Sequence, residues 1–199
     1  MSLFTMTISL FLILDSVGNI TDFLQLIRDL PLERQKRIIL REMIFALLIM
    51  ISVALVGDYI LDALHLGAET VQIAGGIVLF LISIKMVFLS QGRMFTAIDK
   101  SEPFMVPIAT PMIAGPSALA TIMFYSYTEH SSMDLGFAIL IAWAATVAVL
   151  GIAYHYRARV SGNILMALEK LMGLILILMS VEMFLKGLKT FMLLQTGQS

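Results

Sequence analysis

The 199-residue sequence contains no cysteine, and this absence excludes several kinds of chemistry. Disulfide bonds, thiol relays and thiolate-ligated metals all require cysteine, so the chain is not a thiol-redox membrane protein. Charge is also scarce: Asp, Glu, Lys and Arg make up 14% of the residues, against about 25% in soluble domains. The net charge of −1 gives no indication of nucleic acid as a partner.

Long apolar runs dominate the rest of the chain, since hydrophobic residues make up 59% of it. Residues 70–84, 103–128 and 135–156 contain no Lys, Arg, Asp or Glu. A helix needs about 20 apolar residues to cross a bilayer, so the pattern predicts an all-α polytopic membrane protein with one transmembrane domain over residues 1–199. The six transmembrane helices that we expect are Ser2–Ile27, Ile39–Leu61, Thr70–Leu89, Phe104–Tyr127, Leu135–Tyr156 and Ala167–Leu188.

The distribution of basic residues predicts the orientation of these helices. Eleven of the thirteen Lys and Arg residues lie in or beside the connections between spans one and two, three and four, and five and six. The other two connections, residues 58–69 and 129–134, contain no Lys or Arg. Because cytoplasmic loops carry the excess of basic residues, both termini are expected outside the cytoplasm.

Polar residues interrupt the first predicted span over residues 14–22, near the middle of the bilayer. Gly18 permits backbone angles that are closed to other residues, and Asp15 and Asn19 can cap the helix ends that a break exposes. An ionisable group inside a membrane is expensive and is by default a functional candidate. Asp15, Gly18, Asn19 and Thr21 are therefore candidate substrate-binding residues, although a purely structural kink would give the same pattern.

Prolines interrupt the fourth predicted span. Pro107, Pro111 and Pro116 flank Gly115, and each proline removes a backbone N–H and disrupts a helix. Amides exposed at the start of a half-helix can hold a carboxylate, which suits an amino-acid substrate; a kink that packs closely against a neighbour is the alternative. The candidate substrate-binding residues of this stretch are Pro111, Ala114, Gly115, Pro116, Ser117 and Thr121.

A shift of 97 residues relates the two halves of the chain. It places the segment Gly76–Met86 on Gly173–Met183, with five of eleven residues identical, and it places Gly18 on Gly115. Each half, about 1–98 and 99–199, then holds three spans, and an odd number of spans gives the halves opposite topologies. The sequence therefore predicts a 3+3 inverted repeat with broken first and fourth helices, a pattern typical of secondary transporters.

The two interrupted stretches resemble the signatures of the MarC family of integral membrane proteins. Residues 15–23 are similar to that family's Asp-Pro-x-Gly-Asn-x-Pro-x-Phe pattern, and Pro111–Pro116 is similar to its other signature. The likeness covers essentially the whole chain, and it implies six spans in a bacterial inner membrane and transport of small neutral amino acids. The chain departs from the pattern in having Ser16 and Thr21 at usual proline positions, so Gly18 is expected to carry more of the break.

Together these features predict a secondary transporter of small neutral amino acids or similar small solutes. A channel or a structural membrane protein is the alternative, although a channel favours a continuous polar stripe rather than two polar breaks. We expect no enzyme, cofactor or metal site, because the three histidines share no metal-ligand spacing and Asp15 has no second mid-span aspartate on a facing helix. The predicted partners are the lipid bilayer, a small solute, a coupling proton or sodium ion and, in a homo-oligomer, further copies of the chain.

Overall fold

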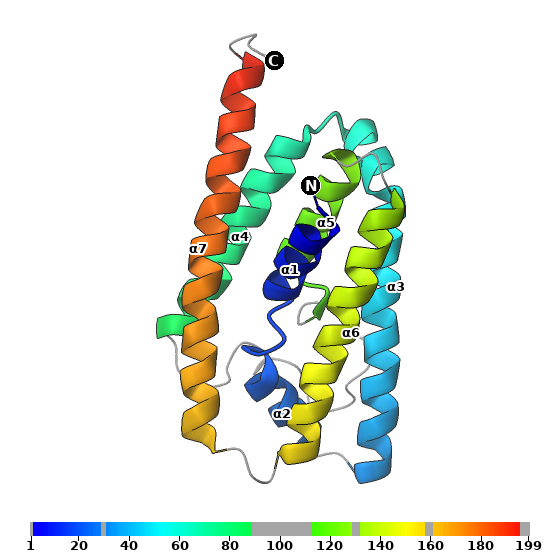
Figure 1. Ribbon diagram of the computed structural model, residues 1–199, viewed down its shortest axis with the longest axis vertical. Coiled ribbons are helices and arrows are strands. Elements are labelled where there is room, and N and C mark those ends of the chain that lie inside the picture. The colour runs from blue at the N-terminus through cyan, green and yellow to red at the C-terminus, as the bar shows by residue number, and fades with distance from the viewer. Residues whose placement is uncertain (1, 29–30, 89–112, 129–131, 158–160, 196–199) are drawn as a thin grey trace.

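In a computed structural model of the protein, the described residues are 2–28, 31–88, 113–128, 132–157 and 161–195, and every regular element among them is helical. The helices are α1 (Leu3–Ile13), α2 (Ile20–Arg28), α3 (Leu32–Leu64), α4 (Ala68–Phe88), α5 (Pro116–Thr128), α6 (Ser132–Tyr156) and α7 (Gly162–Gln195). The long helices α3, α6 and α7 run along the length of the bundle, and the short helices α1 and α2 follow one another between α7 and α6 in this view (Figure 1). The all-α class expected from the sequence is confirmed.

Four helices are long and apolar enough to cross a membrane. They are Arg34–Leu64 within α3, Ala68–Phe88, Met133–Tyr156 within α6, and Gly162–Leu194 within α7. Large apolar side chains point outward from them, and Leu48, Phe88 and Leu178 are each more than half exposed. Apolar side chains on the outer surface of apolar, span-length helices suit contact with lipid rather than water. The prediction of a multi-pass membrane protein is confirmed.

The long helices extend beyond the predicted spans. α3 begins at Leu32 rather than Ile39, and α7 covers Gly162–Gln195 rather than Ala167–Leu188. The prediction counted only the hydrocarbon layer of the bilayer, whereas a helix continues past that layer for as long as its backbone stays hydrogen-bonded. The first predicted span corresponds to α1 and α2, and the fourth is described only from residue 113 onward, since residues 104–112 lie outside the described residues.

Glycines bring the backbones of α4 and α7 into near contact. A Cβ atom at Gly76 would lie 3.0 Å from the carbonyl oxygen of Ser180, and one at Gly173 would lie 3.4 Å from that of Ser83. Small residues allow this close approach between helices in membranes. The two contacts are reciprocal under the 97-residue shift, because Gly76 and Ser83 correspond to Gly173 and Ser180.

Side-chain hydrogen bonds to backbone carbonyls hold α3 against α5 and α6. The Ser126 hydroxyl of α5 donates to the carbonyl of Ala54 at 2.9 Å. The indole N–H of Trp143 in α6 donates to the carbonyl of Met43 at 2.9 Å. Both acceptor carbonyls lie within α3, and a carbonyl oxygen that accepts a helical hydrogen bond still has a second lone pair for another donor. These bonds fix α5 and α6 on α3, and α5 in turn carries one of the candidate stretches.

A cluster around Gln35 anchors the far end of α2. The Gln35 amide donates to the carbonyl of Ile27 at 2.9 Å. Its amide oxygen accepts from the Tyr154 hydroxyl at 3.1 Å and from the Arg157 guanidinium at 3.2 Å. A carbonyl in the last turn of a helix has no intrahelical partner, so Gln35 satisfies one such group of α2. The short helix is thereby attached to both α3 and α6.

Candidate functional site

The chain leaves the helical conformation between Ile13 and Ile20, at mid-height of the bundle (Figure 1). Asp15 has a φ of 46°, in the left-handed region that non-glycine residues rarely adopt. The backbone N–H of Asn19 donates to the carbonyl of Asp15 at 3.0 Å, so the turn is closed by its own backbone. The first break therefore lies where the sequence predicts it.

The side chains of Asp15 and Asn19 form hydrogen bonds within this turn. Asp15 is 5% exposed, and its Oδ1 accepts a hydrogen bond from the backbone N–H of Gly18 at 3.2 Å. The Asn19 amide donates to the carbonyl of Leu14 at 3.3 Å. Ser16 is also buried, and its hydroxyl has no hydrogen-bond partner among the described residues. Freed backbone groups at membrane depth need such partners, so Asp15 and Asn19 both have a structural role.

Gly18 contributes room rather than an unusual backbone angle. The left-handed residue of the turn is Asp15, so the expectation that glycine supplies the special backbone conformation is wrong. Asparagine and aspartate tolerate that region better than most residues because their side chains bond locally, and Asp15 does so. A Cβ atom at Gly18 would collide with the Met86 methyl group and with the Asp15 carboxylate. The glycine thus leaves room for the ends of the Met86 and Asp15 side chains.

The second break is described from Ile113 onward. Residues 113–115 precede α5, which begins at Pro116, a favourable first helical position for proline. Ala114 and Gly115 are buried, Pro116 is exposed, and the carbonyl of Gly115 accepts from the backbone N–H of Leu119 at 3.0 Å. The other prolines of the stretch, Pro107 and the candidate Pro111, lie outside the described residues.

The two hydroxyl candidates of α5 are buried. Ser117 and Thr121 are each 4% exposed. The Thr121 hydroxyl donates to the carbonyl of Ser117 at 2.9 Å and lies 3.7 Å from the Met183 sulfur. A helical hydroxyl that bonds its own backbone has its single proton engaged. Thr121 therefore offers a ligand its oxygen lone pair rather than a donor.

Side chains beside the two breaks belong to one hydrophobic core. Leu14 and Ile20 flank the first break, Ile113 and Ala118 flank the second, and all four are buried in the same cluster. α1 packs against α5 as well as against α6. The helix before the first break thus packs against the helix that follows the second break.

Glu169 on α7 is a neighbour of the first stretch that the sequence reasoning did not treat as a site residue. The Thr21 hydroxyl hydrogen-bonds its carboxylate, and its charge interacts with those of Asp22 and Asp15. Thr21 and Asp22 are half-buried, so this side of the break is more accessible than Asp15. Among the residues that the structure describes, no group of three or more acidic or histidine side chains is placed to hold a metal ion. The contact between Thr21 and Glu169 could not be predicted from the sequence, because neither periodicity nor spacing relates residues that are 148 positions apart.

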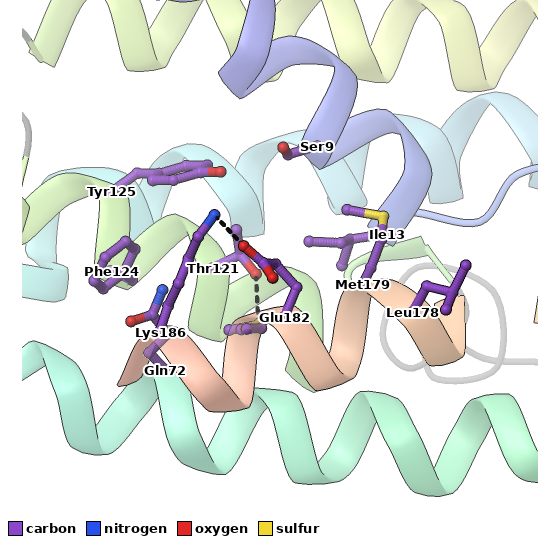
Figure 2. Close-up of a pocket in the computed structure, with 11 residues that line it drawn as sticks. Ser9, Ile13, Gln72, Thr121, Phe124, Tyr125, Leu178, Met179, Glu182 and Lys186 are labelled. Atoms are coloured by element: carbon purple, nitrogen blue, oxygen red, sulfur yellow. Dashed lines mark hydrogen bonds and ion pairs between the residues drawn. The ribbon is translucent and has the colours of Figure 1, made fainter. Parts of the chain in front are cut away.

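A pocket of about 280 Å³ lies between α1, α4, α5 and α7, beside the end of α1. Figure 2 shows its lining residues, among which the Lys186 ammonium and the Glu182 carboxylate form an ion pair of 3.0 Å. Thr121 is the site candidate that lines it. The remaining lining residues are Ser9, Ile13, Gln72, Phe124, Tyr125, Leu178, Met179 and Met183. Glu182, Gln72 and Lys186 are not among the site residues predicted from the sequence.

Comparison with known proteins agrees with the resemblance noted from the two signatures. The pattern described as "MarC family integral membrane protein" matches residues 1–192. A "UPF0056 membrane protein" of Buchnera aphidicola subsp. Baizongia pistaciae is 44% identical over 192 residues, which cover 94% of this chain and 96% of the relative. The "UPF0056 inner membrane protein YhgN" of Escherichia coli K12 is 40% identical over 185 residues, covering 92% and 94%. No solved structure matches the chain.

Proposed function

The chain belongs to the MarC family of integral membrane proteins, and from this premise we propose that it is a secondary transporter of small neutral amino acids or similar small solutes. The observation that carries the proposal is the buried Asp15 in a helix break at mid-height of a membrane bundle. A carboxylate at such a depth is costly in free energy unless it binds a proton, a cation or a polar ligand in the course of function. Discontinuous helices near the bilayer midplane are where secondary transporters hold substrate and coupling ion.

The second break supplies the complementary chemistry. The first N–H groups of α5 have no intrahelical acceptor and carry the positive end of the helix dipole. They follow the buried Ala114 and Gly115, so they suit a carboxylate. In this proposal a zwitterion binds with its ammonium toward Asp15 and its carboxylate toward the start of α5. The coupling ion is a proton or sodium ion at the first break.

The reciprocal glycine contacts between α4 and α7 support the 3+3 inverted repeat within this proposal. A pair of helices related by a two-fold axis makes each contact twice, once in each direction. The contacts are of this kind, because Gly76 approaches Ser180 and its counterpart Gly173 approaches Ser83, the counterpart of Ser180. Six crossings and both termini outside the cytoplasm follow from the repeat and the basic loops. The inner membrane is the location that the printed name of the relative YhgN gives for that protein.

Transport into proteoliposomes tests the function directly. We expect saturable, gradient-dependent uptake or efflux of one or more of radiolabelled glycine, L-alanine, L-serine and L-leucine, and its loss in an Asp15→Asn variant. A channel is the competing function, and it would instead give solute flux that does not saturate, or single-channel current in a planar bilayer. No solute movement under either a proton or a sodium gradient, from protein shown to be inserted and monodisperse, would contradict the proposal.

A further inference from the structure

The pocket between α1, α4, α5 and α7 has polar groups that the breaks do not explain. Its lining comes from the first half of the broken span, the start of α4, the second half of α5 and the C-terminal half of α7. It therefore lies in the half of the bundle that contains the start of α1 and the end of α7 (Figure 1). Ile13, the last residue of α1, and Thr121 of α5 both line it. The pocket thus adjoins the region of the two breaks on one side only.

An opposite pair of charges lies within this mostly apolar lining. Glu182 and Lys186 are one helical turn apart on α7 and pair at 3.0 Å, with side chains that are about 60% exposed. An exposed pair of this kind contributes little to folding stability. Both charged heads remain open to a ligand, and Figure 2 shows them turned toward each other at the pocket. A solute that carries both a positive and a negative group can replace water around both at once.

Gln72 on α4 provides a third polar group. Its side chain is 5% exposed and lines the pocket, and its amide oxygen has no hydrogen-bond partner among the described residues. That oxygen is itself buried, so a solute in the pocket does not reach it while the side chain keeps this orientation. A primary ammonium group brings three donors, and a carboxylate brings only acceptors. Glu182 therefore suits the ammonium and Lys186 the carboxylate of one solute.

We propose that this pocket is an entry site for a neutral α-amino acid, with Glu182 binding the ammonium and Lys186 binding the carboxylate. The site rests on the proposed transport function and lies before Asp15 on the path of the solute. The size of about 280 Å³ falls below the roughly 300–1,000 Å³ of pockets for drug-sized ligands, so the occupant is a single small solute. Apolar contacts with Leu178 and Met179 favour an uncharged, aliphatic side chain.

Binding to the purified full-length protein and transport into proteoliposomes are measured with the same variants. The binding probes are L-leucine, 3-methylbutylamine, which lacks the carboxylate, and 4-methylpentanoate, which lacks the ammonium. We expect L-leucine to bind at least tenfold more tightly than either analogue. Glu182→Gln and Lys186→Gln should each weaken L-leucine binding and raise the transport KM at least tenfold. Lys189→Gln, an exposed change on the same helix away from the pocket, should leave both values unchanged.

A charge swap separates recognition from structure. The double variant Glu182→Lys with Lys186→Glu keeps both charges one turn apart, so it should bind L-leucine more tightly than either single variant. If the wild type transports amino acids while both single variants keep its KM and affinity, the entry site is wrong and the transport function stands. If L-leucine binds through the pair but no gradient drives uptake, the transport function fails instead. Competition by phosphatidylethanolamine vesicles, without competition by free amino acids, would overturn the proposal in favour of a lipid headgroup.

Discussion

The Asp15 carboxylate accepts a hydrogen bond from the backbone N–H of Gly18 at 3.2 Å, and this bond closes the turn between α1 and α2. A side chain proposed to bind substrate or proton is therefore also a structural element of its own loop. Substitution by alanine would remove both roles at once. A variant that tests the function has to keep the side-chain oxygen that accepts the Gly18 hydrogen bond and remove only the negative charge at position 15.

Asp15→Asn meets that condition, because the amide oxygen can accept the same hydrogen bond from Gly18. We expect the variant to insert and to unfold within a few degrees of the wild-type temperature, while gradient-coupled transport falls to background. Asp22→Asn is the matched control, since Asp22 is a half-buried aspartate in the first turn of α2. It should lose far less activity. Wild-type transport by Asp15→Asn would reduce Asp15 to a structural cap.

Gly18→Ala is expected to destabilise the protein, because the added methyl group meets the Met86 side chain and the Asp15 carboxylate. Overpacking of this kind costs about 1–3 kcal/mol. Gly136→Ala on α6 is the control, because nothing lies within 4 Å of its new Cβ and alanine is the better helix former. Thermal unfolding in detergent compares the two. Equal stability of both variants would contradict the close approach at Gly18.

The sequence predicted the four span-length apolar helices that the structure describes and the position of the first break, because both follow from local composition. It could not predict which residue of the turn adopts the left-handed conformation. Glycine is the usual choice for that conformation, yet Asp15 takes it, and Gly18 leaves room for the end of the distant Met86 side chain. The contact of Thr21 with Glu169 was equally inaccessible, because it depends on how α2 and α7 pack.

Gly76→Ala should be more damaging than Gly173→Ala at the crossing of α4 and α7. The new Cβ at Gly76 would lie 2.9 Å from the backbone nitrogen of Phe184, which cannot move independently, whereas at Gly173 the nearest atom is the Val87 Cγ2 at 2.9 Å, in a side chain. Gly151→Ala, with nothing within 4 Å of its Cβ, is the control for both. Unfolding temperatures in detergent should fall in the order Gly151→Ala, Gly173→Ala, Gly76→Ala. A reversed order of the last two would contradict the backbone contact.

The absence of native cysteine makes the orientation simple to test. Ser161 and Asp62 are exposed residues at opposite ends of the bundle, before α7 and near the end of α3. In intact cells, an impermeant thiol reagent applied from outside should label Asp62→Cys and should reach Ser161→Cys only after the membrane is made permeable. The reverse pattern would overturn the positive-inside orientation, and labelling of both from outside would contradict the membrane crossing between them.

The glycine contacts between α4 and α7 also limit how the protein can change shape. Two helices whose backbones touch at Gly76 and at Gly173 cannot slide or rotate past one another without breaking van der Waals contact along the whole crossing. α1, by contrast, is a short helix that ends in a hydrogen-bonded turn, and turns absorb backbone rotation readily. We therefore expect the α4–α7 pair to stay fixed, and in the proposed transport cycle the short helices α1 and α2 to move against it.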